Sequence, residues 1–337
     1  RSARLAASRI VRAFAAISHG YWRGTGAQSA WLLTAGVFAL VIAGIAVQVG
    51  INRWNGMFFD AMEQKNWSRL LEAIWLIIGL AAAMAAAGAA YVQVKMRLQV
   101  RWREWLTSSL VERWLADRRF YRLSVANGRG ISNPEYRIAD DVRNATEPLV
   151  DFLAALTTAV LTVATFIGIL WYVGGSQTLS VGGLNLEIPG FMVVSVLLYS
   201  ACATALMIRV GRPLIAQIET RNTSEAGFRY GLTHTRESAE QIALAGSDSD
   251  ERRRLDGMLA ELVVSWIGVI RREARMTFLT NGTMTLTPVV PLLLCAPKYL
   301  EGQLTLGAMV QIAAAFLVVH QSLNWLADNA IRIAEWL

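Results

Sequence analysis

The chain alternates between long apolar runs and long polar segments that favour helix. Six apolar windows are each about 20 residues long, the length a helix needs to cross the hydrocarbon core of a bilayer. They cover approximately residues 31–51, 73–94, 152–173, 188–208, 276–296 and 304–326. The pattern therefore predicts an all-α membrane protein with six transmembrane helices.

The connections between these windows alternate in length. Two of them are long, about residues 95–151 and 209–275, and their apolar residues recur at helical spacing. We therefore expect the transmembrane helices to continue well beyond the membrane. A helix from Arg209 to Gly246 would be about 57 Å long, which exceeds the thickness of the hydrocarbon core. Pro288 and Pro291 in the fifth window predict a kinked helix there.

Composition and charge support this topology. The chain of 337 residues is 54% hydrophobic and has 12 Trp, which is too apolar for an ordinary soluble domain. Of the 32 Lys and Arg residues, 28 lie in residues 1–30, in the two long connections or after the last window. By the positive-inside rule, both termini and both long connections are cytoplasmic. The net charge of +7 is thus a topology signal and does not indicate nucleic-acid binding.

The chain divides into two parts by pattern. Residues 1–30 are basic and amphipathic, which predicts a helix on the cytoplasmic membrane surface. They lack the apolar core of a cleavable signal peptide. Residues 31–337 form the six-span domain.

Catalytic chemistry has little support in these residues. The three histidines, His19, His234 and His320, are scattered, and no carboxylates have metal-ligand spacing. Cys202 and Cys295 lie in apolar windows and are expected to be packing residues. No GxxxxGK[ST] loop occurs, so these residues do not form the usual ATP cradle. We expect no catalytic site, metal or cofactor within this chain.

Polar residues inside the windows are few. Such residues either bond a neighbouring helix or line a water-filled cavity. The candidates for cavity lining are Gln48, Asn281, Gln311, His320 and Asn324. The scarcity of carboxylates in the windows disfavours an intrinsic proton relay.

The segment after the first window, "NRWNGMFFDAMEQKNW", combines aromatic and acidic residues. Trp54 is typical of an interfacial aromatic belt. Asp60 and Glu63 are candidates for an outer mouth, although a solvated loop helix would have the same pattern.

Charged residues spaced by four predict ion pairs in both long connections. In the second connection, Glu225 stands between Arg221 and Arg229, so one carboxylate could contact two guanidinium groups. In the first, we expect Asn133 to cap a helix in which Arg137 pairs with Asp141, and Arg143 with Glu147.

The stretch "EAGFRYGLTHTRESAEQIALAGSDSDE" predicts a reversal between two helices far from the membrane. Gly246 is a natural helix end, and Ser247 or Asp248 can cap the next helix, with Asp250 or Glu251 closing a capping box. Such an elbow suits the docking of a partner, but a simple solvated hairpin has the same local pattern.

Together, these features resemble the transmembrane domain of an ABC exporter-fold half-transporter. More narrowly, the chain resembles the bacterial SbmA/BacA-like branch with a fused ATPase, which is related to the peroxisomal acyl-CoA transporters of subfamily D. The resemblance rests on "NRWNGMFFDAMEQKNW", "NPEYRIADDVRNATE" and the elbow stretch, which is similar to an EAA-like motif.

The resemblance implies a domain-swapped homodimer in the bacterial inner membrane, working by alternating access. ATP and Mg would bind a nucleotide-binding domain that is absent from these residues, and its closure would move the elbows. The implied coupling residues are Glu225, Arg229, Glu237, Gly246, Glu251, Asn133, Arg137, Asp140 and Asp141. The implied substrates are peptides, including antimicrobial peptides, or other bulky hydrophilic compounds, taken up into the cell.

Two alternatives remain open at this point. An ATPase-free importer of SbmA/BacA type would use a proton gradient, and ATPase activity would then be absent from the whole protein. From another class, a membrane scaffold or receptor could dock a cytoplasmic protein through its elbows without transport.

Overall fold

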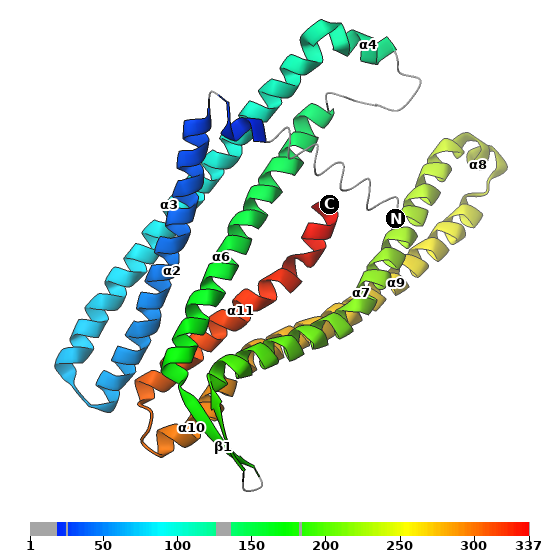
Figure 1. The fold of residues 1–337 in the computed structure, drawn as a ribbon. Coiled ribbons are helices and arrows are strands. Elements are labelled where there is room, and N and C mark those ends of the chain that lie inside the picture. The colour runs from blue at the N-terminus through cyan, green and yellow to red at the C-terminus, as the bar shows by residue number, and fades with distance from the viewer. Residues whose placement is uncertain (1–18, 25, 126–135, 182–183, 337) are drawn as a thin grey trace. The chain divides into compact units, whose positions relative to one another are not determined.

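A computed structural model describes residues 19–24, 26–125, 136–181 and 184–336 (Figure 1). The chain divides into two compact units, Arg1–Val193 with Pro291–Leu337, and Val194–Val290. The predicted surface helix within residues 1–18 and the predicted cap at Asn133 lie outside the described residues.

Six helical segments in the described part of the chain are long and apolar enough to cross a membrane. Each predicted window falls almost entirely within one of them, so the six-span, all-α prediction is confirmed. The segments are Ala27–Glu63, Trp67–Arg122, Ile138–Gly174, Phe191–Glu237, Asp248–Leu300 and Leu306–Trp325.

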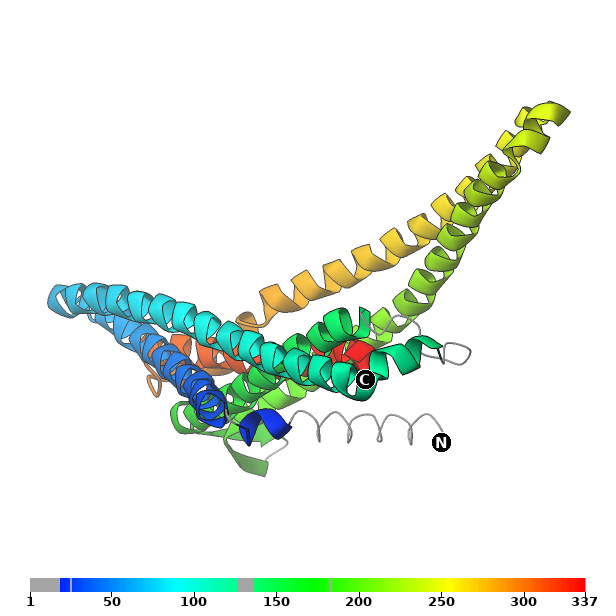
Figure 2. The same ribbon diagram turned by 90° about the horizontal axis from the view of Figure 1, so that it is seen from above.

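The first unit is built on an antiparallel helical hairpin, α2 (Ala27–Glu63) and α3 (Trp67–Leu115), whose turn lies near Asn66 (Figures 1 and 2). The side chain of Asn66 accepts the Arg69 N–H at 3.2 Å and so caps α3. Helix α11 (Leu306–Trp336) packs against α2 and against α6 (Val142–Gly174). Shorter elements complete the unit: η1 (His19–Trp22), η2 (Ala116–Arg118), α4 (Arg119–Val125), η3 (Arg137–Asp141) and most of α10 (Val289–Leu300).

An aromatic cluster holds η1 against the hairpin. The Trp22 ring lies 5.3 Å from the Trp102 ring, and the Tyr21 ring lies 5.9 Å from the Trp105 ring. A Cβ on Gly20 would stand 2.7 Å from the Trp105 ring, so this approach requires glycine. The start of the chain's first span is thereby fixed to α3.

A β-hairpin follows α6 and was not predicted from sequence. Strands β1 (Ser176–Val181) and β2 (Leu184–Pro189) pair antiparallel, from Ser176 opposite Pro189 to Val181 opposite Leu184. Lys298 Nζ donates to the Gly174 carbonyl at 3.4 Å and to the Ser176 carbonyl. A lysine on carbonyls at the end of a helix also complements the helix dipole.

The second unit is a hairpin of two long helices, α7 (Phe191–Glu237) and α9 (Asp248–Leu286), with α8 (Ala239–Ala245) at its tip (Figure 1). Glycines let the two long helices approach closely, because a Cβ on Gly231 would lie 2.7 Å from Met258 Sδ. The Arg221 guanidinium stacks over the Trp266 ring at 4.8 Å. Helix α9 ends at Leu286 and α10 begins at Val289, so the helix is interrupted where the prolines predict a kink.

Candidate functional site

The tip of the α7–α9 hairpin reverses where the sequence predicts it. Gly246 adopts the left-handed conformation, with φ 60° and ψ 29°. The Ser247 N–H donates to the Ile242 carbonyl at 3.2 Å, which closes the end of α8. We call α8 and this reversal, residues 238–247, the elbow.

The capping box predicted for the next helix does not form. Ser247 occupies the N-cap position of α9, but its side chain makes no capping hydrogen bond. Instead, three acidic residues stand in the first turn of α9: Asp248, Asp250 and Glu251. Their charge favours the positive end of the helix dipole, so the helix start is stabilised electrostatically.

Glu251 forms a clamp across the hairpin instead of a capping box. Its carboxylate accepts hydrogen bonds from Thr235 Oγ1 on α7 and from the Arg254 guanidinium on α9. Arg254 also donates to the Gly231 carbonyl of α7 at 3.5 Å. We call Thr235, Glu251 and Arg254 the elbow clamp, because these side chains tie α7 to α9 just beside the elbow.

The clamp changes the acidity of its carboxylate. The hydrogen bonds from Arg254 first, and from Thr235 second, lower the pKa of Glu251 to about 2. Glu251 lies in the hairpin extension, well beyond the apolar window of its helix. The carboxylate therefore remains charged, and the clamp closed, throughout the neutral pH range.

A cavity of about 360 Å³ lies beside the clamp, between α7, α8 and α9. Its apolar lining is Phe228, Leu232, Ile242, Leu255 and Leu259, and its polar rim is Thr235, Asp248, Glu251, Arg252 and Asp256. An apolar floor with a charged rim is typical of a surface that receives a side chain of a binding partner.

The ion pairs predicted upstream form only in part. Glu225 lies 3.7 Å from Arg229, as predicted, but Arg221 turns away to Trp266. Arg221 also donates to Asn222 at 2.9 Å. The prediction that Glu225 contacts two guanidinium groups is therefore wrong, because a cation–π contact holds Arg221. Glu237 is exposed at the end of α7.

The other coupling candidates begin at η3, a single π-helical turn that includes Arg137, Asp140 and Asp141. Asp140 pairs with Arg143 at 3.5 Å, while Asp141 is exposed. The predicted pair of Arg143 with Glu147 is wrong, because Glu147 lies 3.4 Å from Arg103 of α3. Arg143 and Glu147 lie on the same regular helix, but each pairs with another residue: Arg143 with Asp140, and Glu147 with Arg103 of the neighbouring α3.

Polar contacts between α3 and α6 extend beyond the Arg103–Glu147 pair. We call the contacts among Lys95, Gln99, Arg103, Glu147 and Asp151 the α3–α6 ladder. Lys95 Nζ lies 2.7 Å from Asp151 Oδ1. Buried Gln99 donates to the same Asp151 oxygen at 3.0 Å and to the Glu147 carbonyl at 3.1 Å. The ladder connects the second and third spans where they leave the apolar windows.

The five candidates for cavity lining have different surroundings. His320 is buried, and Asn324 Nδ2 lies 2.9 Å from its Nε2 atom. Gln48 and Gln311 are partly buried, and Asn281 is exposed. Their role in lining a cavity stays a prediction.

The three outer-mouth candidates bind neighbouring helices of the first unit. Asp60 Oδ1 accepts the Gly307 N–H at 2.9 Å, and Glu63 Oε2 accepts the Leu306 N–H at 3.0 Å. The two carboxylates therefore cap α11 and complement its dipole. Trp54 Nε1 donates to the Ala73 carbonyl of α3 at 2.6 Å.

The sequence analysis did not identify the residues that let α2 and α11 approach each other closely. A Cβ on Gly307 would stand 2.0 Å from the Gly56 carbonyl oxygen, and a Cβ on Gly56 would stand 2.9 Å from Gln311 Oε1. Asn52, one turn before Gly56, donates to the Gln311 carbonyl at 3.0 Å. The regular spacing of Asn52, Gly56 and Asp60 on one helix face was the available signal.

These sites hold helices together and present surfaces. Among the described residues, no group of three or more His, Cys, Asp or Glu side chains is placed to hold a metal ion. The α7–α9 hairpin is long, and its charged tip is held by the elbow clamp.

Comparison with known proteins identifies the family to which this architecture belongs. The model of the family described as ABC transporter transmembrane region 2 matches residues 24–300. The chain is 26% identical, over 97% of its length, to the inner membrane ABC transporter ATP-binding protein YddA of Escherichia coli (strain K12), and covers 58% of that protein.

Two further relatives agree. The identity is 27% with ABC transporter D family member 2, chloroplastic, of Arabidopsis thaliana, over 93% of this chain and 43% of that protein. It is 28% with the uncharacterized ABC transporter ATP-binding protein sll0182 of Synechocystis sp., over 91% of this chain and 44% of that protein. The chain thus spans about half the length of the relatives it matches.

A family match over most of the chain, together with six membrane-spanning helices, leads to one conclusion. The chain belongs to the ABC transporter transmembrane region 2 family and is a multi-pass membrane domain of the exporter type.

Proposed function

We propose that this chain is the transmembrane domain of an ATP-driven importer of peptides or other bulky hydrophilic compounds. The observation that carries the proposal is the clamped elbow at the end of a long hairpin, in a chain of this family. Two of the relatives are named ATP-binding proteins. A nucleotide-binding domain in the full-length protein would use the elbow as its contact.

The hairpin has the mechanical properties this role requires. Helices α7 and α9 are 47 and 39 residues long, so each can span a membrane and extend beyond it. The Glu251 clamp and the Arg221–Trp266 stack join the two helices at separate levels. A displacement at the elbow would therefore move both helices together, which converts nucleotide-driven closure into alternating access.

We further propose a homodimer in the bacterial inner membrane, with both termini and the elbow in the cytoplasm. The basic residues of both long connections support this orientation. The compactness of Val194–Val290 as a unit of its own supports a hairpin that can be exchanged between two copies. In this assembly Gln48, Asn281, Gln311, His320 and Asn324 would offer polar contacts to a hydrophilic substrate.

The test uses the full-length protein in proteoliposomes with ATP and a fluorescein-labelled cationic peptide of about 20 residues. We expect uptake that requires ATP. Removing the clamp by Glu251→Gln should reduce uptake at least about ten-fold while ATP hydrolysis continues, since the defect lies in transmission. Glu261→Gln, which removes an exposed carboxylate from the same helix, is the matched control and should transport normally.

Two results would count against the proposal. Uptake that follows a pH gradient without ATP would support the proton-coupled alternative. ATP hydrolysis that continues with no uptake of peptide in any lipid composition would remove the peptide substrate class.

A further inference from the structure

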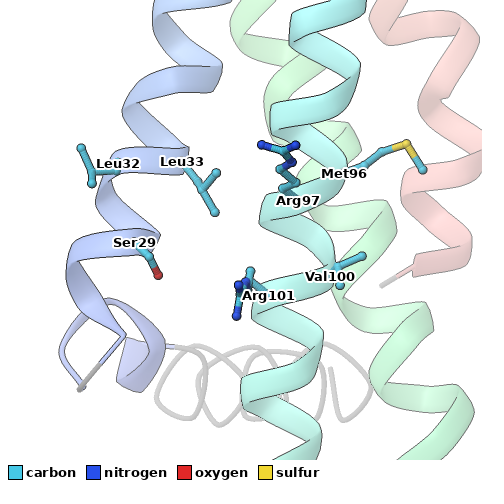
Figure 3. Close-up of a pocket in the computed structure, with 7 residues that line it drawn as sticks. All are labelled: Ser29, Leu32, Leu33, Met96, Arg97, Val100 and Arg101. Carbon is cyan, nitrogen blue, oxygen red and sulfur yellow. The ribbon is translucent and has the colours of Figure 1, made fainter.

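A pocket of about 590 Å³ lies between α2 and α3 (Figure 3). Its lining is Ser29, Leu32, Leu33, Met96, Arg97, Val100 and Arg101. The pocket lies entirely within the first unit. Its volume falls in the range of small-molecule sites.

The level at which this pocket lies in the membrane follows from the sequence. Ser29 precedes the first apolar window by two residues, and Arg97 follows the second window by three. Because α2 and α3 are antiparallel, these two window ends lie at the same membrane face (Figure 1). The pocket therefore lies at the boundary between acyl chains and headgroups, on the side that carries the helical extensions.

The pocket combines two kinds of chemistry at this boundary. Arg97 and Arg101 stand one turn apart on α3, and their side chains lie on the side toward α2 (Figure 3). Apolar side chains of the same lining are exposed: Leu32 is 74%, Val100 62% and Met96 55% exposed. Guanidinium groups bind phosphate oxygens in paired hydrogen bonds, and exposed aliphatic groups at this depth suit acyl chains.

The charges in the pocket are not cancelled by its own lining. The lining includes no acidic residue. Arg101 pairs with Glu104 at 3.6 Å, with both side chains largely exposed, and such a pair is weak. Arg97 has no ion pair within the described part of the chain. The pocket therefore presents net positive charge to a single anionic group.

We propose that this pocket binds one anionic phospholipid of the adjoining leaflet, with its phosphate at Arg97 and Arg101 and its acyl chains along Leu32, Met96 and Val100. Basic pockets between transmembrane helices are a recognised setting for anionic headgroups. The lipid would connect the first two spans at the level where α3 leaves the membrane. This proposal does not depend on the transported substrate or on ATP.

The test is native mass spectrometry of the full-length protein, released from nanodiscs containing equal amounts of phosphatidylglycerol and phosphatidylcholine with identical acyl chains. We expect one phosphatidylglycerol per protomer to be retained. Arg97→Gln with Arg101→Gln should lower this retention at least about ten-fold, because both phosphate contacts are lost. Phosphatidylcholine retention should not change.

The matched control is Arg113→Gln with Arg118→Gln. Arg113 lies near the end of α3, and Arg118 lies just beyond it in η2. Both are exposed, and the control variant loses the same charge as the test variant. Arg113 lies about 24 Å from Arg97 along α3. The control should retain phosphatidylglycerol as the unmodified protein does, and gel filtration should give both variants the same elution volume.

Three outcomes would overturn the proposal. The first is equal retention of phosphatidylglycerol by both double variants. The second is displacement of the lipid by millimolar inorganic phosphate, which would show a site for free anions. The third is retention that occurs only after deletion of residues 1–18, which would show that the chain's own N-terminal segment occupies the pocket.

Discussion

At the scale of single residues, the most demanding contact is the crossing of α2 and α11. Gly307 has room for a hydrogen only, because the Gly56 carbonyl oxygen would lie 2.0 Å from its Cβ. Gly307→Ala should therefore separate the two helices and weaken the hydrogen bond from the Gly307 N–H to Asp60. Overpacking of this kind costs about 1–3 kcal/mol. We expect a lower Tm for the full-length protein in detergent.

The control for this substitution is Gly282→Ala in α9. A Cβ at Gly282 would meet nothing within 4 Å. Alanine is the better helix former by about 0.5–1 kcal/mol, so this variant should be neutral or slightly more stable. Equal changes in Tm for both glycines would contradict the close crossing.

The elbow clamp makes a prediction about pH. The pKa of Glu251 in the folded hairpin is lowered to about 2 from an ordinary value of 4.5. A carboxyl with a lowered pKa stabilises the folded state above its unfolded pKa and loses this effect as the pH falls toward its folded pKa. The clamp should therefore be fully formed above about pH 4.5 and should open as the pH approaches 2.

Spin labels at positions 236 and 249, both exposed, would report this opening as a broader distance distribution. Cys202 is exposed and would first be replaced by serine, whereas Cys295 is buried. In Glu251→Gln the distribution should be broad at every pH, and in Glu261→Gln it should follow the unmodified protein. A distribution that stays narrow down to pH 2 would show that other contacts hold the tip.

At the scale of elements, the α3–α6 ladder depends on Gln99. Its amide donates to Asp151 and to the Glu147 carbonyl from a buried position. Gln99→Leu leaves both acceptors without this donor, and a loss of buried hydrogen bonds costs about 1–3 kcal/mol. We expect the Tm to fall.

Gln93→Leu is the matched control on the same helix, because Gln93 is exposed within the second apolar window. Leucine is at least as favourable as glutamine in lipid, so this variant should keep or raise the Tm. A similar loss in both variants would mean that the ladder adds no stability.

The elements themselves were largely predictable from sequence. A bilayer requires about 20 apolar residues in each helix, so the six spans follow directly from the hydropathy pattern. The stop at Gly246 was equally predictable, since a left-handed residue at a helix end favours glycine. The kink predicted at Pro288 follows from the missing N–H of proline, and the structure interrupts the helix there.

Other features could not be predicted because they depend on neighbours that are distant in sequence. Glu147 has Arg143 at the right spacing but pairs with Arg103 of another helix. Glu251 has the spacing to close a capping box with Asp248, but it binds Thr235 across the hairpin. The short pattern at residues 176–189 gave too weak a signal for its β-hairpin. Local spacing limits the possible partners, and tertiary packing selects among them.

At the scale of the whole molecule, the proposals concern an assembly of two copies. If the elbows are contacts of a nucleotide-binding domain in the full-length homodimer, ATP should change the distance between the two elbows. A single spin label at Ser249, in a Cys202→Ser background, would measure this distance in nanodiscs. We expect one distribution without nucleotide and a shift of several Å with ATP and Mg under conditions that prevent hydrolysis.

The clamp connects this whole-molecule motion to a single carboxylate. In Glu251→Gln the two elbows should still respond to ATP, because the contact with the nucleotide-binding domain remains. A second label at Asn281, far along α9 from the elbow, should then respond less than in the unmodified protein, because α7 and α9 no longer move as one lever. Equal responses at both positions in both proteins would assign the rigidity to other contacts, such as the Arg221–Trp266 stack. The absence of any distance between copies would contradict the homodimer itself.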